Sequence, residues 1–92
     1  MLYMTILTWE PDKRDAVIER TKKLGFQHEG MKVLGTWIEA AGPRAFQLSD
    51  IPREAGPAIF LKDNFAWNDI MKIESVAVIN GEDMMKFVES MK

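Results

Sequence analysis

The stretch from Lys32 to Ser49, KVLGTWIEAAGPRAFQLS, constrains the fold of this chain more than any other. It contains two apolar-rich runs of strand length, separated by the four residues Ala40-Ala41-Gly42-Pro43. Adjacent Gly and Pro favour a turn, and runs of this length on either side are typical of paired strands. The stretch therefore predicts a β-hairpin.

A four-residue loop also fixes which residues of the hairpin face one another. The opposing pairs are Glu39–Arg44, Trp37–Phe46 and Gly35–Leu48. An acid then lies opposite a base at the hairpin mouth, and an aromatic ring lies opposite another one step further in. Each such pair favours antiparallel strands by about 0.2–1 kcal/mol. The pairing predicts an antiparallel sheet.

The residues before the hairpin predict one strand and one helix. Leu2–Trp9 is apolar and alternates in the manner of a strand. Pro11 suits the first turn of a helix, which we expect to run to about Leu24 because Gly25 supplies a stop.

The residues after the hairpin predict a second helix and a last strand. Asp50 is a candidate cap for the helix, with Pro52 in its first turn and an end near Asn64. Gly56-Pro57 falls inside that segment, and because proline breaks a helix interior we expect a kink or two short pieces there. Ile70–Ile79 predicts the last strand.

A tail helix follows the Asn80-Gly81 turn. Its apolar side chains recur at helical spacing and form one stripe, made of Met84, Phe87, Val88 and Met91. The element order is thus βαββαβ with a helical tail. Right-handed crossovers then predict a ferredoxin-like α+β fold, with a four-stranded antiparallel sheet and two helices on one face. We expect one domain over residues 1–92, with a core over 1–80 and a C-terminal helix over 81–92.

Two helices cover one face of such a sheet, so the composition of the other face matters. We assign to the helix side Leu2, Met4, Ile6, Trp37, Phe46, Leu48, Ile73, Ala77 and Ile79. The second face then carries Tyr3, Thr5, Leu7, Trp9, Leu34, Thr36, Ile38, Gln47, Glu74, Val76 and Val78. That face is too apolar for water, since large exposed apolar patches mark interfaces. It predicts a homodimer whose sheets pack face to face as a dimeric α/β barrel.

Composition excludes several classes of function. Twelve Lys and Arg against fourteen Asp and Glu give a net charge of −2, which lacks the basic surface of a nucleic-acid-binding protein. Without cysteine the chain has no disulfide, no thiolate nucleophile and no Cys-based metal site. The amino terminus has only a short apolar run, so we expect no signal peptide, no membrane span and a cytoplasmic location.

The chain also resembles a known family. The pattern is Gly35-x-Trp37, then Arg44-x-Phe46-Gln47-Leu48, then Trp67-x-Asp69, with Glu74 and Val78 behind it. It resembles the family catalogued as domain of unknown function 3303, which is similar in turn to the dimeric α/β-barrel superfamily of small monooxygenases, dismutases, stress-response proteins and ligand-sensing domains. The resemblance implies a ferredoxin-like homodimer and supplies no catalytic residues. The chain departs from the family at Ala77, where a proline is frequent, and at the interrupted second helix.

Five polar residues on the predicted second face form the candidate ligand site: Tyr3, Thr5, Thr36, Gln47 and Glu74. A few polar groups converging in an apolar cavity are typical of small-molecule sites. A desolvated Glu74 would have a raised pKa and act as a general acid or base. The alternative is that Glu74 pairs with Lys72 or an edge arginine, and that Gln47 satisfies backbone groups in a packed interface.

Other candidates have structural interpretations. His28 is the only histidine; a single histidine without cysteine is a poor metal set, so we expect it to be solvated in a loop. Trp67-Asn68-Asp69 is expected to cap the core and form a turn, and Glu39 to pair with Arg44. The leading function is a homodimer that binds a small, partly apolar organic molecule, with any chemistry independent of a cofactor, as in the monooxygenases of the superfamily. The alternative is a non-enzymatic sensor or interaction module whose tail helix docks on a partner.

Overall fold

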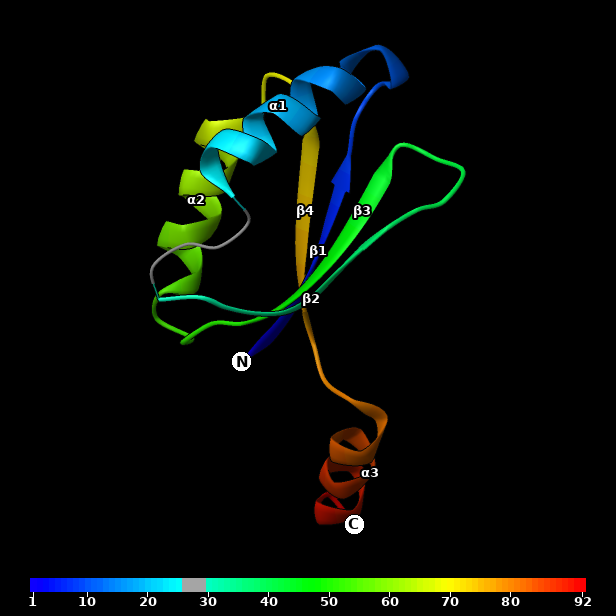
Figure 1. The fold of residues 1–92 in the computed structure, drawn as a ribbon. Coiled ribbons are helices and arrows are strands. Elements are labelled where there is room, and N and C mark those ends of the chain that lie inside the picture. The colour runs from blue at the N-terminus through cyan, green and yellow to red at the C-terminus, as the bar shows by residue number, and fades with distance from the viewer. Residues whose placement is uncertain (26–29) are drawn as a thin grey trace.

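The computed structural model describes residues 1–25 and 30–92 (Figure 1). Its elements are β1 (Leu2–Thr8), the 3-10 turn η1 (Pro11–Lys13), α1 (Arg14–Leu24), β2 (Lys32–Ile38), β3 (Arg44–Asp50), α2 (Gly56–Trp67), β4 (Lys72–Val78) and α3 (Gly81–Ser90). The strands form one sheet in the order β2-β3-β1-β4, and each neighbouring pair is antiparallel. This is the expected ferredoxin-like α+β fold with a helical tail.

The hairpin of β2 and β3 has the predicted register. Trp37 lies opposite Phe46 and Gly35 opposite Leu48. At the mouth, the Glu39 amide donates to the Arg44 carbonyl at 2.8 Å, and Arg44 Nε donates to Glu39 Oε2 at 2.6 Å. The Arg44 guanidinium also lies 5.5 Å from the Phe46 ring centroid. Side-chain pairs across the strands thus secure the turn, as expected from the sequence.

The two helices of the core begin and end for identifiable reasons. Gly25 closes α1 at φ 71°, a conformation that glycine adopts without steric cost, and its amide donates to the Thr21 carbonyl. The expected kink at Gly56-Pro57 was wrong, since both residues lie in the first turn of α2. Proline is tolerated there because its missing amide hydrogen has no intrahelical partner. α2 is one continuous helix and ends at Trp67.

The assignment of the sheet faces was wrong for β1, β2 and β3 and right for β4, where Ile73 and Ala77 lie under the helices. Tyr3 pairs with Ser49 and Thr5 with Gln47, and this set of side chains lies beneath the helices. The helix face therefore carries Tyr3, Thr5, Leu7, Val33, Thr36, Ile38, Ala45, Gln47, Ser49, Ile73, Ser75 and Ala77. Neither face is distinctly polar, so alternation alone did not indicate which one the helices cover. The expected pairing of β4 with β1 was shifted by one residue, since Val78 and not Ala77 lies opposite Leu2.

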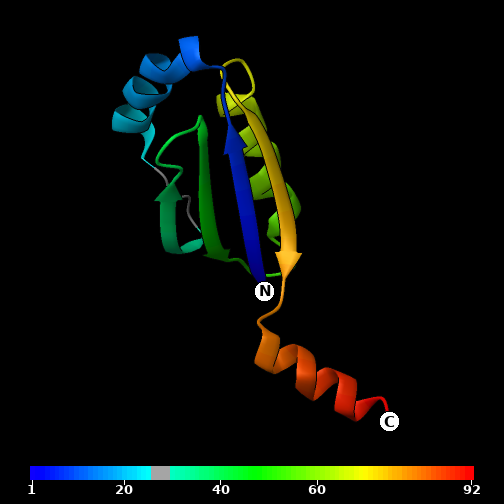
Figure 2. The ribbon, with the colours of Figure 1, turned by 90° about the vertical axis from the view of Figure 1, so that its right-hand side faces the viewer.

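The core lies between the helices and the sheet in two clusters. In the first, Val17 of α1 packs with Trp67 and Ile70, and Ile73 lies against them. The second is built on buried Met31, Ile51 and Ile59, with Tyr3, Val33, Ala55 and Phe60 around them. Figure 2 shows α2 lying along the sheet and α1 over its end, beside the β1–α1 connection. On the helix face of β3, Ala45, Gln47 and Ser49 are buried, whereas Ile38 at the hairpin end of β2 is 67% exposed.

A charged pair links α1 to the segment after α2. Both guanidinium nitrogens of Arg20 donate to the Asp69 carboxylate, at 2.5 and 2.9 Å, and Arg20 Nη1 also donates to the Ala66 carbonyl at 2.8 Å. The hydrogen bond from Arg20 lowers the pKa of Asp69. Trp67 is buried and Arg20 lies 5.9 Å from its ring centroid. The segment Trp67-Asn68-Asp69 therefore has a structural role, as expected.

The opposite face of the sheet, here called the open face, has no helix over it (Figure 2). Its apolar side chains are Leu2, Met4, Ile6, Trp37, Phe46, Leu48, Val76 and Val78. Trp37 is 55% exposed although its ring lies so close to Gly35 that a Cβ on Gly35 would be 2.5 Å from it. The open face also carries the charged residues Lys32, Arg44, Asp50, Lys72 and Glu74, whereas the face under the helices has a row of uncharged polar side chains across its centre.

The C-terminal helix α3 projects beyond the end of β4, away from the sheet and from α1 and α2 (Figures 1 and 2). Asn80 caps it, because its side-chain oxygen accepts from the Asp83 amide at 2.8 Å. Every residue of α3 is exposed, and Phe87 is 61% exposed. Across residues 1–25 and 30–92, no helix has the length and apolar character required to span a membrane. The cytoplasmic location stays a prediction.

Candidate functional site

A cavity of about 740 Å³ lies between α1, the hairpin loop and the helix face of the sheet. We call it the α1–hairpin cavity. Its floor is formed by sheet residues Thr5, Leu7, Ile38, Ala45, Gln47 and Ile73. Its walls include Trp9, α1, the loop from Glu39 to Pro43, and Trp67. α1 rests on the cluster around Trp67 and Ile70, and the cavity lies between α1 and the hairpin end of the sheet.

A row of four polar side chains crosses the helix face of the sheet, one from each strand, and two of them, Thr5 and Gln47, line this cavity. The polar row consists of Thr36, Gln47, Thr5 and Ser75. Gln47 Nε2 donates to Thr36 Oγ1 at 3.4 Å, and the hydroxyls of Thr5 and Ser75 are 3.0 Å apart. Side chains that face one another in neighbouring strands are within reach of such bonds. The polar row is therefore a direct product of the strand register.

Gln47 is the part of the polar row best placed to meet a ligand. It is 6% exposed and lines the cavity together with Thr5. Its one hydrogen bond within residues 1–25 and 30–92 is the long contact to Thr36. A carboxamide has two donor hydrogens and an acceptor oxygen, and buried polar groups are normally satisfied. Gln47 thus retains capacity for a hydrogen bond at the cavity floor.

The five residues predicted for the site do not all come together. Thr5, Thr36 and Gln47 are neighbours in the polar row. Tyr3 lies on the same face, but its ring packs edge-on against Phe60 at 4.9 Å, and it does not line the cavity.

Glu74 lies on the open face, where it forms an ion pair with Lys72 at 3.1 Å. This ion pair is the one named in the alternative for Glu74, and Glu74 does not share a face of the sheet with Gln47.

Sequence reasoning missed Ser75 and the contribution of α1 to the site. Ser75 lies on the helix face because β4 is shifted by one residue from the expected pairing. The spacing of Arg14, Val17, Ile18, Thr21 and Lys22 would have indicated one continuous helix face, but their position over a cavity depends on the tilt of α1. His28 lies outside the described residues. Among the described residues, no group of three or more His, Cys, Asp or Glu side chains forms a potential metal site.

The polar row can orient a molecule by hydrogen bonds, and none of its four members has an ionisable carboxyl, imidazole or amine. Such an arrangement supports recognition of a ligand better than it supports proton transfer.

The comparison with known families agrees with the resemblance in the hairpin and the Trp67-x-Asp69 segment. The family model described as Domain of unknown function (DUF3303) matches residues 1–92. The chain belongs to this family. The match spans the sheet, the helices around the α1–hairpin cavity and α3, so all of these are parts of the DUF3303 domain. No curated protein and no solved structure matches the chain.

Proposed function

We propose that this DUF3303 protein binds a small, partly apolar organic molecule in the α1–hairpin cavity. The observation that carries the proposal is the combination of a cavity of about 740 Å³ with mostly apolar walls and a buried carboxamide, that of Gln47, at its floor. Small-molecule sites have volumes of about 300–1,000 Å³ and combine apolar walls with a few polar groups that fix orientation.

Binding is favoured over a monooxygenase-like reaction. Such a reaction without a cofactor needs a proton-transfer group beside the substrate, within about 3 Å. Among the described residues that line the cavity, Glu39 is committed to Arg44 at 2.6 Å and Asp63 has an interaction of its own. Glu74, the expected general base, lies on the other side of the sheet. A role in sensing or carrying the ligand follows more directly from these residues than catalysis does.

The test uses native mass spectrometry of gently purified protein, followed by titration of the compound found as an adduct. Gln47→Leu should weaken binding of that compound about two- to twelvefold, since a lost hydrogen bond is worth about 0.5–1.5 kcal/mol. Glu74→Gln is the matched control, because it changes a polar residue on the open face and should leave binding unchanged. An adduct whose affinity is insensitive to Gln47→Leu and sensitive to Glu74→Gln would place the site on the open face.

We also propose that the chain is a homodimer whose open faces meet. In support, the side of the sheet without helices carries large apolar side chains, of which Trp37 is 55% and Val76 48% exposed, the latter opposite Met4. Stable interfaces bury about 800 Å² per partner, which a four-stranded face of this length can supply. Val76→Glu should shift the chain to monomer in sedimentation at micromolar concentration. Leu61→Glu, on exposed α2, is the control that should leave the dimer intact. A wild-type monomer under these conditions would refute the dimer.

A non-enzymatic interaction module is the second candidate, and α3 is the observation that favours it. Its exposed apolar side chains are Met84, Met85, Phe87, Val88 and Met91. A ten-residue helix is marginal by itself in water, so this helix needs a surface to cover its stripe. We take that surface to be the second copy. Truncation after Ile79 should then weaken the dimer, whereas an unchanged dimer would mean that α3 serves another partner.

A further inference from the structure

One face of α1 borders the α1–hairpin cavity along its whole length. The residues on this face recur at helical spacing: Arg14, Val17, Ile18, Thr21 and Lys22. Apolar Val17 and Ile18 occupy the middle, and a cation stands at each end. Arg14 and Lys22 are eight residues apart, about 12 Å along the helix axis. The wall of the cavity that α1 provides is therefore apolar at its centre and positively charged at both ends.

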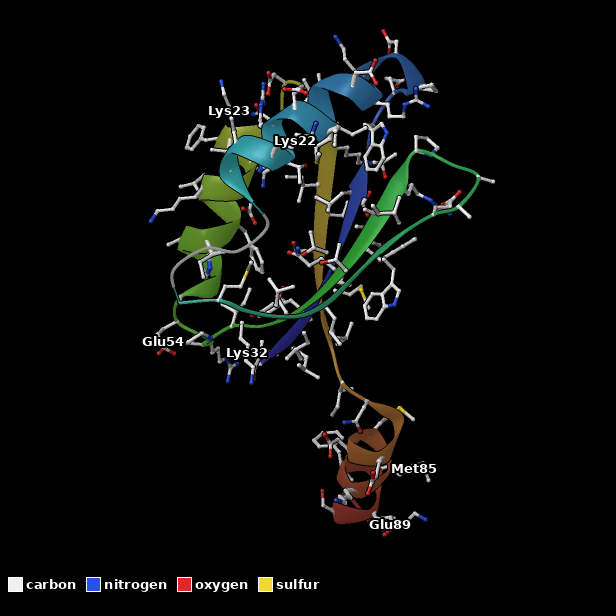
Figure 3. The ribbon with its side chains drawn as sticks, viewed as in Figure 1. Lys22, Lys23, Lys32, Glu54, Met85 and Glu89 are labelled. Atoms are coloured by element: carbon white, nitrogen blue, oxygen red, sulfur yellow. The ribbon has the colours of Figure 1, made fainter. Side chains whose placement is uncertain are left out.

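The two cations are available to a ligand. Arg14 is paired with Asp15 at 3.7 Å and Lys22 with Glu19 at 3.7 Å, and both basic side chains are 71% exposed. Exposed ion pairs of this length contribute little and exchange readily. Figure 3 shows Lys22 and Lys23 projecting from α1, but only Lys22 borders the cavity.

The acidic groups at the cavity are less available. Glu39 holds the short contact to Arg44, and Asp63 has an interaction of its own. Among the described residues that line the cavity, the exposed charged groups held only by long ion pairs are therefore the cations Arg14 and Lys22. The floor offers the uncharged groups of Thr5 and Gln47. An ionised group placed on that floor would lose its hydration without a counter-charge, which is strongly unfavourable, whereas at the rim it stays hydrated.

From this arrangement we infer that the ligand is an amphipathic organic anion, such as an aromatic or aliphatic carboxylate. Its apolar body lies between α1 and the sheet, and its anionic group lies at the rim beside Arg14 or Lys22. This inference rests on the proposed function, because it assigns a chemical class to the molecule that the cavity binds.

Two fluorescent probes with the same ring system test the inference. One is 8-anilinonaphthalene-1-sulfonate, an anion, and the other is N-phenyl-1-naphthylamine, which lacks the sulfonate. We expect the anion to bind up to about fivefold more tightly, because one exposed charge contact of about 0.2–1 kcal/mol corresponds to a factor of about 1.4–5. Raising the salt concentration should reduce this preference.

The variants distinguish the effect of the two cations on anion binding from the effect of cavity volume on the binding of either probe. The double variant Arg14→Gln/Lys22→Gln should remove the preference and leave binding of the neutral probe unchanged. Lys23→Gln, which removes a neighbouring charge outside the cavity, should have no effect on either probe. Ala45→Leu narrows the cavity floor and should weaken both probes, which distinguishes cavity binding from adsorption to the open face or α3.

Equal affinities for the two probes, both weakened by Ala45→Leu, would overturn the inference and leave the proposed function standing. Binding of neither probe, or binding that Ala45→Leu does not change, would overturn both. A preference for the anion that survives Arg14→Gln/Lys22→Gln would overturn the assignment of the anionic group to α1.

Discussion

Replacing Ala45 by leucine tests whether the α1–hairpin cavity is empty in the folded protein, so that a larger side chain fits there. Ala45 is buried on β3, opposite Leu7 and Ile38, and all three line the cavity. Leucine adds three carbon atoms that would enter the cavity of about 740 Å³. At about 0.8 kcal/mol per buried CH₂, less about 0.5–1 kcal/mol of lost rotamer freedom, the variant should gain about 1–2 kcal/mol in unfolding free energy.

Ile51→Phe is the matched control, since it also enlarges a buried side chain. Ile51 is 1% exposed and packs with Met31 and Ile59, so it has no comparable space beside it. Overpacking such a site costs about 1–3 kcal/mol. The two variants should therefore shift stability in opposite directions.

The measurement is urea unfolding followed by circular dichroism, at one fixed protein concentration because dimerisation would couple stability to concentration. Ala45→Leu should raise the midpoint with little change in slope, and Ile51→Phe should lower it. A midpoint that falls for both variants would mean that the space beside Ala45 is filled or closed in solution, and the reasoning from the cavity would be refuted.

Two further predictions concern the links that hold α1. Because Arg20 lowers the pKa of Asp69 in the folded chain, the stabilisation should be present above the ordinary carboxyl pKa of 3.8 and be lost as pH falls through the lower folded value. Asp69→Asn should therefore flatten the acid limb of a stability–pH profile; an unchanged limb would show that the pair does not contribute. Gly25→Ala should lower the unfolding free energy by about 1–2 kcal/mol because of its φ of 71°. Gly81→Ala, where a Cβ meets nothing within 4 Å, should cost far less, and equal losses would contradict this reasoning.

Much of the fold could be predicted from local pattern. Gly42-Pro43 and the pairs Glu39–Arg44 and Trp37–Phe46 fixed the hairpin and its register, because cross-strand pairing is decided by neighbours in sequence. Gly25 fixed the end of α1 for a similarly local reason. The prediction of a kink at Pro57 failed because proline breaks a helix interior but is favoured in the first turn. Which of these applies depends on where α2 begins, and it begins at Gly56.

Only part of the candidate site could be predicted from the sequence. Thr5, Thr36 and Gln47 were grouped correctly because alternation within paired strands keeps them on one face. Glu74 was grouped with them wrongly because the pairing of β4 with β1 joins segments about 70 residues apart, and no local signal sets that register. A shift of one residue there exchanges Glu74 for Ser75.

The sequence by itself determined the order of the elements, the hairpin register and the apolar character of both sheet faces. It did not determine which face the helices cover, since both faces offer apolar side chains and a strand alternates in the same way whichever face is buried. Only the tertiary structure decided that α1 and α2 pack over the polar row, because their connections and the cluster around Trp67 and Ile70 set their side of the sheet. That packing leaves Gln47 at the floor of a cavity and the face with Trp37, Phe46 and Val76 open.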